Sequence, residues 1–271
     1  MRVNGEPAAL IAANDRGVMY GDGLFETIRF ERGNAPLWPR HMARLAHGCE
    51  RLKLPVPDTA LLQREALAEI GDREQAVVRI TLTRGVGTRG YAQPAAVQAT
   101  RIVAASPLPR LEPAMYRDGI RLYRCQTRLG DQPQLAGIKH LNRLEQVLAR
   151  AEWDDPAMAE GLVCDTHGNA ISATAANLFA VIDGNVVTPG VERCGVAGVM
   201  RAEVLAALPG VAARNLPLAE CLAADEVFLS SSVRGILPVR AVGDARFAAP
   251  GTVARAMLQH WCELGFSMGQ A

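Results

Sequence analysis

The residue of this sequence best placed to do chemistry is Lys139, which follows the apolar residues 135–138 and is the only lysine after Lys53. Apolar surroundings lower the pKa of an amine by desolvation and leave it free to attack a carbonyl carbon. Lys139 therefore has the character of a lysine that forms an imine with an aldehyde. The alternative is a lysine that covers apolar surface at the start of a helix, and the residue taken alone favours that alternative.

Three segments contain the residue types that bind a phosphate group. Arg44 follows His41 by three residues, so both lie on one face of a helix. Residues 195–201 are a glycine-bearing loop that runs into a helix, where the backbone N–H groups of Val199 and Met200 attract an anion. Ser232 ends a serine triplet that follows a strand. Taken singly, each has an ordinary explanation: a solvated arginine, a flexible turn and a serine-rich loop.

Residues 84–91 read Arg-Gly-Val-Gly-Thr-Arg-Gly-Tyr and resemble a glycine-rich loop, but they lack the spacing of the nucleotide-binding motifs. Arginines separated by glycines suit the recognition of carboxylates through paired hydrogen bonds. We expect Arg84, Arg89 or Tyr91 to bind substrate carboxylates, within one chain or across a dimer interface; a solvated hairpin tip is the alternative. A lysine that forms an imine, together with several phosphate-binding segments, indicates pyridoxal phosphate as the cofactor.

Composition argues against several classes of protein. The 271 residues carry a formal net charge of +1, so no bulk field attracts nucleic acid or an anionic membrane. The six cysteines form no CxxC pair and the five histidines form no ligand pair, which argues against a zinc site or a disulfide framework. No apolar run approaches the roughly 20 residues of a membrane span. We expect a cytoplasmic protein that holds no metal and binds neither nucleic acid nor membranes.

The elements that must position these residues predict an α+β fold with two domains. Strands are expected at residues 24–31, 35–38, 76–84, 100–105, 119–126, 162–165, 170–174, 178–182, 186–188 and 226–230. Helices are expected at residues 39–51, 58–70, 138–153, 199–207, 218–223 and 252–263. A proline-rich stretch predicts a linker at 108–118, between a smaller domain at 1–107 and a larger domain at 119–271 that carries Lys139.

Short motifs along nearly the whole chain resemble, in order, those of the fold-type IV pyridoxal-phosphate enzymes. That family includes branched-chain and D-amino-acid aminotransferases and aminodeoxychorismate lyases. Beside the lysine segment, the motifs are Asp-Arg-Gly at 15–17, Gly-Asp-Gly-Leu-Phe-Glu at 21–26, His-Met-Ala-Arg at 41–44, Asn-Leu-Phe at 177–179, Thr-Pro at 188–189, Gly-Val-Met-Arg at 198–201, Ala-Asp-Glu-Val-Phe at 224–228 and Leu-Pro-Val at 237–239. The resemblance implies a two-domain α+β fold and a homodimer that acts on a small-molecule substrate.

The resemblance also implies roles for particular residues. Lys139 holds the cofactor through an imine and then acts as the general base. Thr27 lies two residues beyond Phe25 on a strand that faces this chemistry, so we expect Thr27 to hydrogen-bond or relay a proton and Phe25 to contact substrate. The phosphate ligands that the resemblance implies are Arg44, the backbone of Val199 and Met200, and the hydroxyl of Ser232.

Within the family, residues 137–146 and 84–91 look most like the lyases, which release p-aminobenzoate and pyruvate for folate synthesis from the product of aminodeoxychorismate synthase. One position departs from the family pattern. The glutamate that usually pairs with the ring nitrogen of the cofactor, five residues before Asn177, is Ser172 here. Serine offers only a neutral hydrogen bond, so the cofactor becomes a weaker electron sink, which favours elimination over transamination. An aminotransferase and a binding protein that has lost the chemistry are the alternatives.

Overall fold

The computed structural model describes residues 1–87, 89–94 and 96–268. Thr88, within the predicted carboxylate-binding segment, and residues 269–271, at the end of the expected second domain, lie outside the described residues. Contacts along the chain divide it into two compact units. The first unit contains Met1–Pro109 and Ile138–Asn142, and the second contains Arg110–Gly137 and Arg143–Ala271. Both combine helices with sheets, which confirms the predicted α+β fold.

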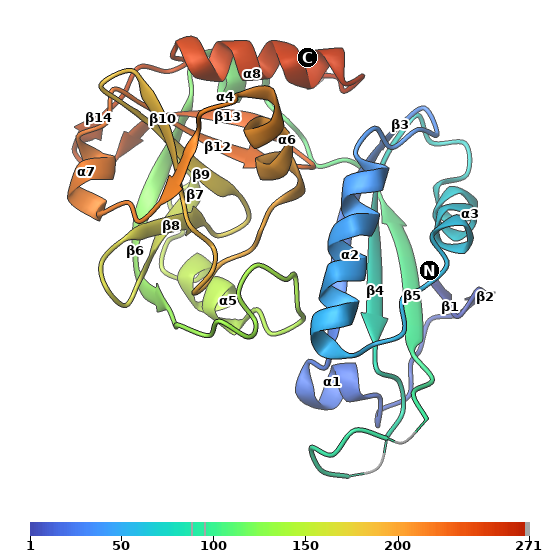
Figure 1. The fold of residues 1–271 in the computed structure, drawn as a ribbon. Coiled ribbons are helices and arrows are strands. Elements are labelled where there is room, and N and C mark those ends of the chain that lie inside the picture. Colours follow the sequence, from blue (N-terminus) through green and yellow to red (C-terminus); the bar gives the residue numbers. More distant parts are fainter. Residues whose placement is uncertain (88, 95, 269–271) are drawn as a thin grey trace. The chain divides into compact units, whose positions relative to one another are not determined.

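The first unit is an antiparallel sheet with strand order β2-β1-β5-β4-β3, on which helices α2 and α3 pack (Figure 1). β3 lies at the edge of this sheet. The elements are β1 (Arg2–Val3), β2 (Glu6–Pro7), α1 (Arg16–Tyr20), β3 (Gly23–Glu31), α2 (Trp38–Leu52), α3 (Thr59–Ile70), β4 (Gln75–Thr83) and β5 (Thr100–Ser106).

Alternating side chains explain how the sheet and helices of this unit fit together. Leu24 and Ile28 are 2% and 1% exposed and point toward the helices, and a Cβ on Gly48 of α2 would lie 2.8 Å from the Leu24 side chain. α3 begins at the predicted cap, because the Asp58 carboxylate accepts a hydrogen bond from the Ala60 amide at 2.8 Å. The strand predicted at 35–38 is wrong: the chain turns there and enters α2 at Trp38.

The second unit is built on a nine-stranded sheet with the order β11-β10-β9-β12-β13-β6-β7-β8, and β14 pairs with β13. β8 pairs back onto β9, so the strands from β9 to β8 close into a ring. The strands are β6 (Ile120–Leu129), β7 (Met158–Asp165), β8 (Ala170–Ala173), β9 (Asn177–Ile182), β10 (Asn185–Pro189), β11 (Ala212–Arg214), β12 (Glu226–Ser231), β13 (Gly235–Val242) and β14 (Ala245–Arg246).

Helices cover this ring. α4 and α8 pack on β13, α6 packs on β12, and α5 packs on β6 and β7. α4 falls within the linker predicted at 108–118; Tyr116 is buried there and donates a hydrogen bond to the Arg234 carbonyl at 2.9 Å. The helices are α4 (Pro113–Arg117), α5 (Leu144–Arg150), α6 (Val199–Ala207), α7 (Leu218–Leu222) and α8 (Thr252–Glu263).

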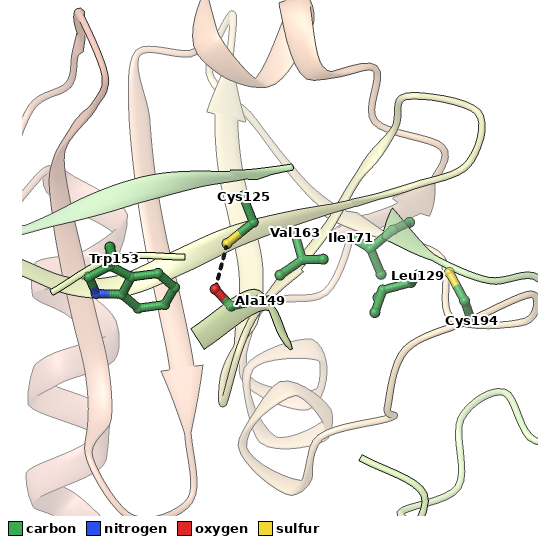
Figure 2. Close-up of a cluster of buried hydrophobic side chains, with 7 residues drawn as sticks. All are labelled: Cys125, Leu129, Ala149, Trp153, Val163, Ile171 and Cys194. Carbon is green, nitrogen blue, oxygen red and sulfur yellow. Dashed lines mark hydrogen bonds between the residues drawn. The ribbon is translucent and has the colours of Figure 1, made fainter. Parts of the chain in front are cut away.

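Figure 2 shows the part of the core against which α5 packs, where Ala149 and Trp153 lie among buried side chains from the strands. The Cys125 thiol lies 3.8 Å from the Ala149 carbonyl oxygen, and burial raises the pKa of Cys125 to about 12. Such a thiol stays protonated and unreactive at neutral pH. The cluster is Cys125, Leu129, Ala149, Trp153, Val163, Ile171 and Cys194.

The helix predicted at 138–153 is wrong over its first part, because α5 begins only at Leu144. Residues 138–142 are extended and belong to the first unit by their contacts, whereas the sequence had placed Lys139 in the second domain. The physical reason is a tertiary one: main-chain hydrogen bonds to the edge of β3 replace the helical bonds that the sequence pattern predicts.

Two properties of the described residues bear on function. No helix in this part of the chain is long and apolar enough to cross a membrane. Across the same residues, no group of three or more His, Cys, Asp and Glu side chains is placed to hold a metal ion.

Candidate active site

Lys139 lies on a short extended segment that pairs with the outer edge of β3. The amide N–H of Phe25 donates to the Lys139 carbonyl at 2.9 Å, and the amide N–H of Leu141 donates to the Gly23 carbonyl at 3.0 Å. Because side chains alternate along paired extended segments, this register puts the Lys139 side chain on the same face as Phe25. The position of the lysine is therefore set by its backbone.

The sheet face that carries Lys139 also presents a ring, a hydroxyl and a guanidinium. The Lys139 Nζ lies 4.2 Å from the centroid of the Phe25 ring, and the guanidinium carbon of Arg79 lies 4.0 Å from it. Thr27 is paired directly with Arg79 in the register of β3 and β4. Burial lowers the pKa of the Arg79 guanidinium. An amine, a guanidinium and a hydroxyl on one face suit an anionic substrate from which an amine removes a proton.

The opposite face of β3 carries a buried ionic cluster. Glu26 is 1% exposed and accepts hydrogen bonds from Arg44 Nε at 2.8 Å and Arg44 Nη2 at 2.5 Å. The Nδ1 of His41 lies 2.6 Å from the Glu26 Oε2. Both partners come from α2, where their spacing of three residues places them on one face, as the sequence predicts.

The protonation states of this cluster follow from burial and charge. Burial raises the pKa of Glu26, but the charge and hydrogen bonds of Arg44 outweigh that effect and bring the pKa down to about 2. Burial is also the main cause that lowers the pKa of His41, against its bond to Glu26. At neutral pH Glu26 is charged and His41 is neutral. The carboxylate thus fixes the plane of the Arg44 guanidinium.

The second unit contains a helix start suited to an anion. No side chain caps α6, so the amides of Val199 and Met200 point out of the helix end with a partial positive charge. A Cβ on Gly198 would lie 1.8 Å from the Asn177 Oδ1, so only glycine allows the backbone to come this close. The glycine-bearing loop predicted from the sequence is therefore required by packing.

Asn177 connects this helix start to two serines. Its Nδ2 donates to the Val196 carbonyl at 2.8 Å, and in the sheet it pairs with Ser172 of β8 and Ser230 of β12. Ser230 is 2% exposed, and its hydroxyl oxygen is buried without a hydrogen-bond partner. A buried orphan hydroxyl calls for a ligand or a water. Ser232, the serine predicted to bind phosphate, is half-buried in the turn after β12.

The residues present fit pyridoxal phosphate. Lys139 supplies the amine that its aldehyde needs, while Arg44 and the start of α6 supply the cationic and N–H donors that its phosphate needs. The buried Ser230 hydroxyl, without a partner, is consistent with a bound polar group. The individual roles of Lys139, Thr27, Arg44, Ser172 and Ser232 stay predictions.

Arg84 is bound by partners within the first unit, which among the three predicted residues favours Arg89 and Tyr91 for the substrate. It is 2% exposed and donates to both oxygens of Asp22, at 2.8 and 3.0 Å. Its other bonds go to the carbonyls of Leu52 at 2.7 Å and Lys53 at 3.0 Å. Arg89 and Tyr91 are exposed instead, and Tyr91 is 87% exposed. Asp22, which neutralises Arg84, is far from it in the sequence, so residue spacing alone could not reveal this pair.

Sequence reasoning missed Arg79 and Glu26. Arg79 appeared only as one polar position of an alternating strand, and Glu26 only as part of a family motif. The signal for Glu26 was its place on the buried side of β3, where a carboxylate requires a cationic partner. Arg79 gave no such signal, because an arginine at an exposed position of an alternating strand is ordinary.

The chain is similar over most of its length to known proteins. The family model described as amino-transferase class IV matches residues 23–242. The aminodeoxychorismate lyase of Vibrio harveyi is 38% identical over 245 residues, covering 89% of this chain and 90% of that protein. The putative branched-chain-amino-acid aminotransferase of Methanocaldococcus jannaschii is 30% identical over 242 residues, covering 86% and 83%. The crystal structure of 4-amino-4-deoxychorismate lyase from Pseudomonas aeruginosa matches with a TM-score of 0.92 and 47% identity, covering 97% of this chain and 98% of that one.

Proposed function

This chain belongs to the class IV aminotransferase family, and we propose that it is a pyridoxal-phosphate-dependent lyase that converts 4-amino-4-deoxychorismate to p-aminobenzoate and pyruvate. The observation that carries the proposal is the likeness to the Pseudomonas aeruginosa lyase, which extends over both units and exceeds in identity the likeness to the Methanocaldococcus jannaschii aminotransferase. The arrangement around Lys139 supports the same chemistry, because it joins an amine to groups that bind anions.

The residues that the sequence predicts to bind the cofactor keep those roles in the proposal. Arg44, oriented by Glu26, and the amides of Val199 and Met200 bind the phosphate, with the Ser232 hydroxyl as a further donor. Ser172 would offer the ring nitrogen of the cofactor a neutral hydrogen bond. When bound, pyridoxal phosphate supplies an electron sink for the electron pair that the substrate carbon releases on losing its proton.

The reaction needs one proton removed and one carbon–oxygen bond broken. Lys139 Nζ takes the proton from C4 of the substrate as the general base, since it lies 4.2 Å from the centroid of the Phe25 ring, on the sheet face that carries the groups proposed to bind the substrate. The C3–O bond then breaks, the ring becomes aromatic, and the enolpyruvyl group leaves. Lys139 or water returns a proton to the leaving group, which becomes pyruvate. Thr27, on the same strand face, hydrogen-bonds or relays this proton.

The two carboxylates of the substrate need cationic partners. Arg79 lies beside Thr27 on the face that carries Lys139, so it takes one carboxylate. Arg89 and Tyr91 are exposed on their loop and bind the other, in this chain's own site or in that of a second copy. Phe25 packs against the substrate ring.

The direct test is incubation of the cofactor-loaded enzyme with 4-amino-4-deoxychorismate. We expect p-aminobenzoate and pyruvate to form in equal amounts. An aminotransferase would instead transfer the amino group of alanine to 2-oxoglutarate at a rate that exceeds elimination, and this outcome would overturn the proposal. A protein that has lost the chemistry would show no visible cofactor absorbance, and borohydride would fix nothing on Lys139.

Ser172 is expected to restrain transamination. Replacing it with glutamate supplies a charged partner for the ring nitrogen, which strengthens the electron sink. A Ser172→Glu variant should raise half-transamination with D- or L-alanine by about tenfold, the difference between a neutral and a charge-assisted hydrogen bond. Single-turnover absorbance measurements record this rate, and Ser172→Ala is the matched control without the charge. A wild-type enzyme that already transaminates as fast as it eliminates would contradict the idea.

A homodimer in the cytoplasm, supplied by an aminodeoxychorismate synthase, completes the proposal. α5 supports the dimer. Ala149 of this helix is buried in the core shown in Figure 2, whereas Leu144, Val147 and Leu148 are 75%, 59% and 61% exposed. Apolar side chains on one helix side are typical of a covered interface.

We expect a Leu148→Asp variant to weaken the dimer about a hundredfold, because each copy loses one apolar contact and gains a charge at the interface. Sedimentation over a range of concentrations measures the change, with Leu67→Asp, an exposed leucine of α3, as the control. A wild-type chain that sediments as a monomer at all concentrations would exclude the dimer.

A further inference from the structure

Three consecutive carbonyl groups of the loop after β4 converge on one buried guanidinium. Arg16 is 4% exposed, and its Nη1 donates to the carbonyls of Gly90 at 2.9 Å and Ala92 at 3.3 Å. Its Nη2 donates to the carbonyl of Tyr91 at 3.2 Å. A rigid planar group with five N–H donors can hold a curved backbone in this way, and a lysine cannot.

Asp22 fixes the position of this guanidinium. Its Oδ2 accepts a hydrogen bond from Arg16 Nε at 2.9 Å and another from Arg84 Nε at 2.8 Å. Arg84 in turn donates to the carbonyls at the end of α2. Burial raises the pKa of Asp22, but the two arginines outweigh it and lower the pKa, so the carboxylate stays charged. The loop is thereby tied through Arg16 and Asp22 to the frame of the first unit.

The close approach of the loop backbone to Arg16 and to neighbouring backbone explains why the loop contains glycines. A Cβ on Gly87 would lie 2.8 Å from Arg16 Cδ, and a Cβ on Gly85 would lie 1.9 Å from the Gln98 carbonyl oxygen. Gly90 has a φ of 102°, which favours glycine. The glycine spacing that resembles a phosphate-binding loop in the sequence therefore lets the backbone close around Arg16.

The side chain of Tyr20 also contacts both Arg16 and the loop. The guanidinium of Arg16 lies 4.9 Å from the centroid of Tyr20, and the Tyr20 hydroxyl accepts a hydrogen bond from the Gly90 amide at 3.1 Å. The rings of Tyr20 and Tyr91 lie 5.5 Å apart. While the backbone is held on its inner side, Arg89 and Tyr91 are exposed on the outer side.

We propose that Arg16 is a positioning residue for substrate binding: it holds residues 89–92 so that Arg89 and Tyr91 face outward in one fixed arrangement. The inference rests on the proposed function, in which these two side chains recognise a substrate carboxylate. Holding the loop before the substrate arrives removes the entropy cost of ordering it on binding. Loss of Arg16 therefore affects KM and leaves the proton transfer at Lys139 intact.

The experiment is a double-mutant cycle on the cofactor-loaded enzyme, with Arg16→Met, Arg89→Ala and the double variant. Arg16→Met should raise KM for the substrate about tenfold, with kcat changed less than about twofold and the cofactor absorbance unchanged. In the Arg89→Ala background, the same change should raise KM less than about twofold further, because the residue through which Arg16 acts is already gone. Amide hydrogen exchange in the loop should be faster in both variants that lack Arg16.

Arg101→Met is the matched control. Arg101 belongs to the same unit and also pairs with an acid, since its guanidinium donates to both oxygens of Glu65 at 2.7 and 2.6 Å rather than to the loop. It should lower stability and leave KM unchanged. Arg16→Lys, which keeps the charge beside Asp22, replaces Arg16→Met if that variant does not fold, and it should raise KM in the same direction.

Two results would overturn the inference: an equal KM penalty in both backgrounds, or loop exchange that Arg16→Met does not change. A third result distinguishes failure of the proposed function from failure of this inference. If Arg89→Ala leaves KM unchanged, the carboxylate role of Arg89 fails, whereas accelerated exchange in Arg16→Met would still establish that Arg16 holds the loop.

Discussion

A Lys139→Ala variant is expected to form p-aminobenzoate at least about a thousandfold more slowly than the wild type, because it lacks both the amine that binds the cofactor and the general base. The backbone bonds from the Lys139 carbonyl and the Leu141 amide to β3 do not involve the side chain, so the fold should persist. Single-turnover assays at saturating cofactor measure the rate. Borohydride treatment followed by peptide mapping measures the covalent bond.

The control is Lys53→Ala, which removes the other lysine of the sequence. Lys53 ends α2, where its carbonyl accepts a bond from Arg84, and its side chain has no proposed part in the reaction. We expect wild-type turnover and unchanged borohydride labelling in this variant. Label that persisted on Lys53 in the Lys139→Ala protein, or turnover that survived the loss of Lys139, would refute the assignment.

The sequence predicted the identity of the lysine but not how it is held. Residues 138–142 continue the periodic pattern of α5, and local patterns cannot reveal that the free edge of β3 offers hydrogen bonds to them. In contrast, α3 and α6 were predicted to within a residue, because the Asp58 cap of α3 and the apolar periodicity of both helices are local. The sequence therefore predicted a helix correctly where the interactions that define it lie within the helix itself.

The same limit applies to charged residues at the candidate site. Arg84 and Arg79 look alike in the sequence, where each occupies or follows a β-strand. The structure separates them, since Asp22 neutralises Arg84 while Arg79 lies over Phe25. Which arginine is available to an anion depends on an acid from another part of the chain, and spacing does not encode that partner.

Glu26 gives the second large effect, on stability. A Glu26→Gln variant keeps the shape of the side chain but leaves the Arg44 guanidinium without its buried counter-ion. Removing one member of a buried ion pair costs about 3–5 kcal/mol. We expect the free energy of unfolding at neutral pH to fall by about 3 kcal/mol in the cofactor-free protein, which excludes stabilisation by bound ligand. Urea unfolding followed by circular dichroism measures it.

The pH dependence tests the cause of that loss. The pKa of Glu26 is about 2 in the folded protein against 4.5 for a free side chain, so its stabilisation is complete above 4.5 and disappears as the pH falls toward 2. Burial lowers the pKa of His41 and Glu26 raises it, so the variant, which lacks the carboxylate, loses more stability than the wild type below pH 6.5. The stability difference between wild type and Glu26→Gln should therefore be constant above pH 6.5, and once His41 is protonated in both proteins it should shrink as the pH falls from 4.5 toward 2. Glu220→Gln, which breaks the exposed pair with Arg214, should show a much smaller difference throughout. A difference between wild type and Glu26→Gln that stays constant down to pH 2 would mean that the carboxylate acts through its shape and not through its charge.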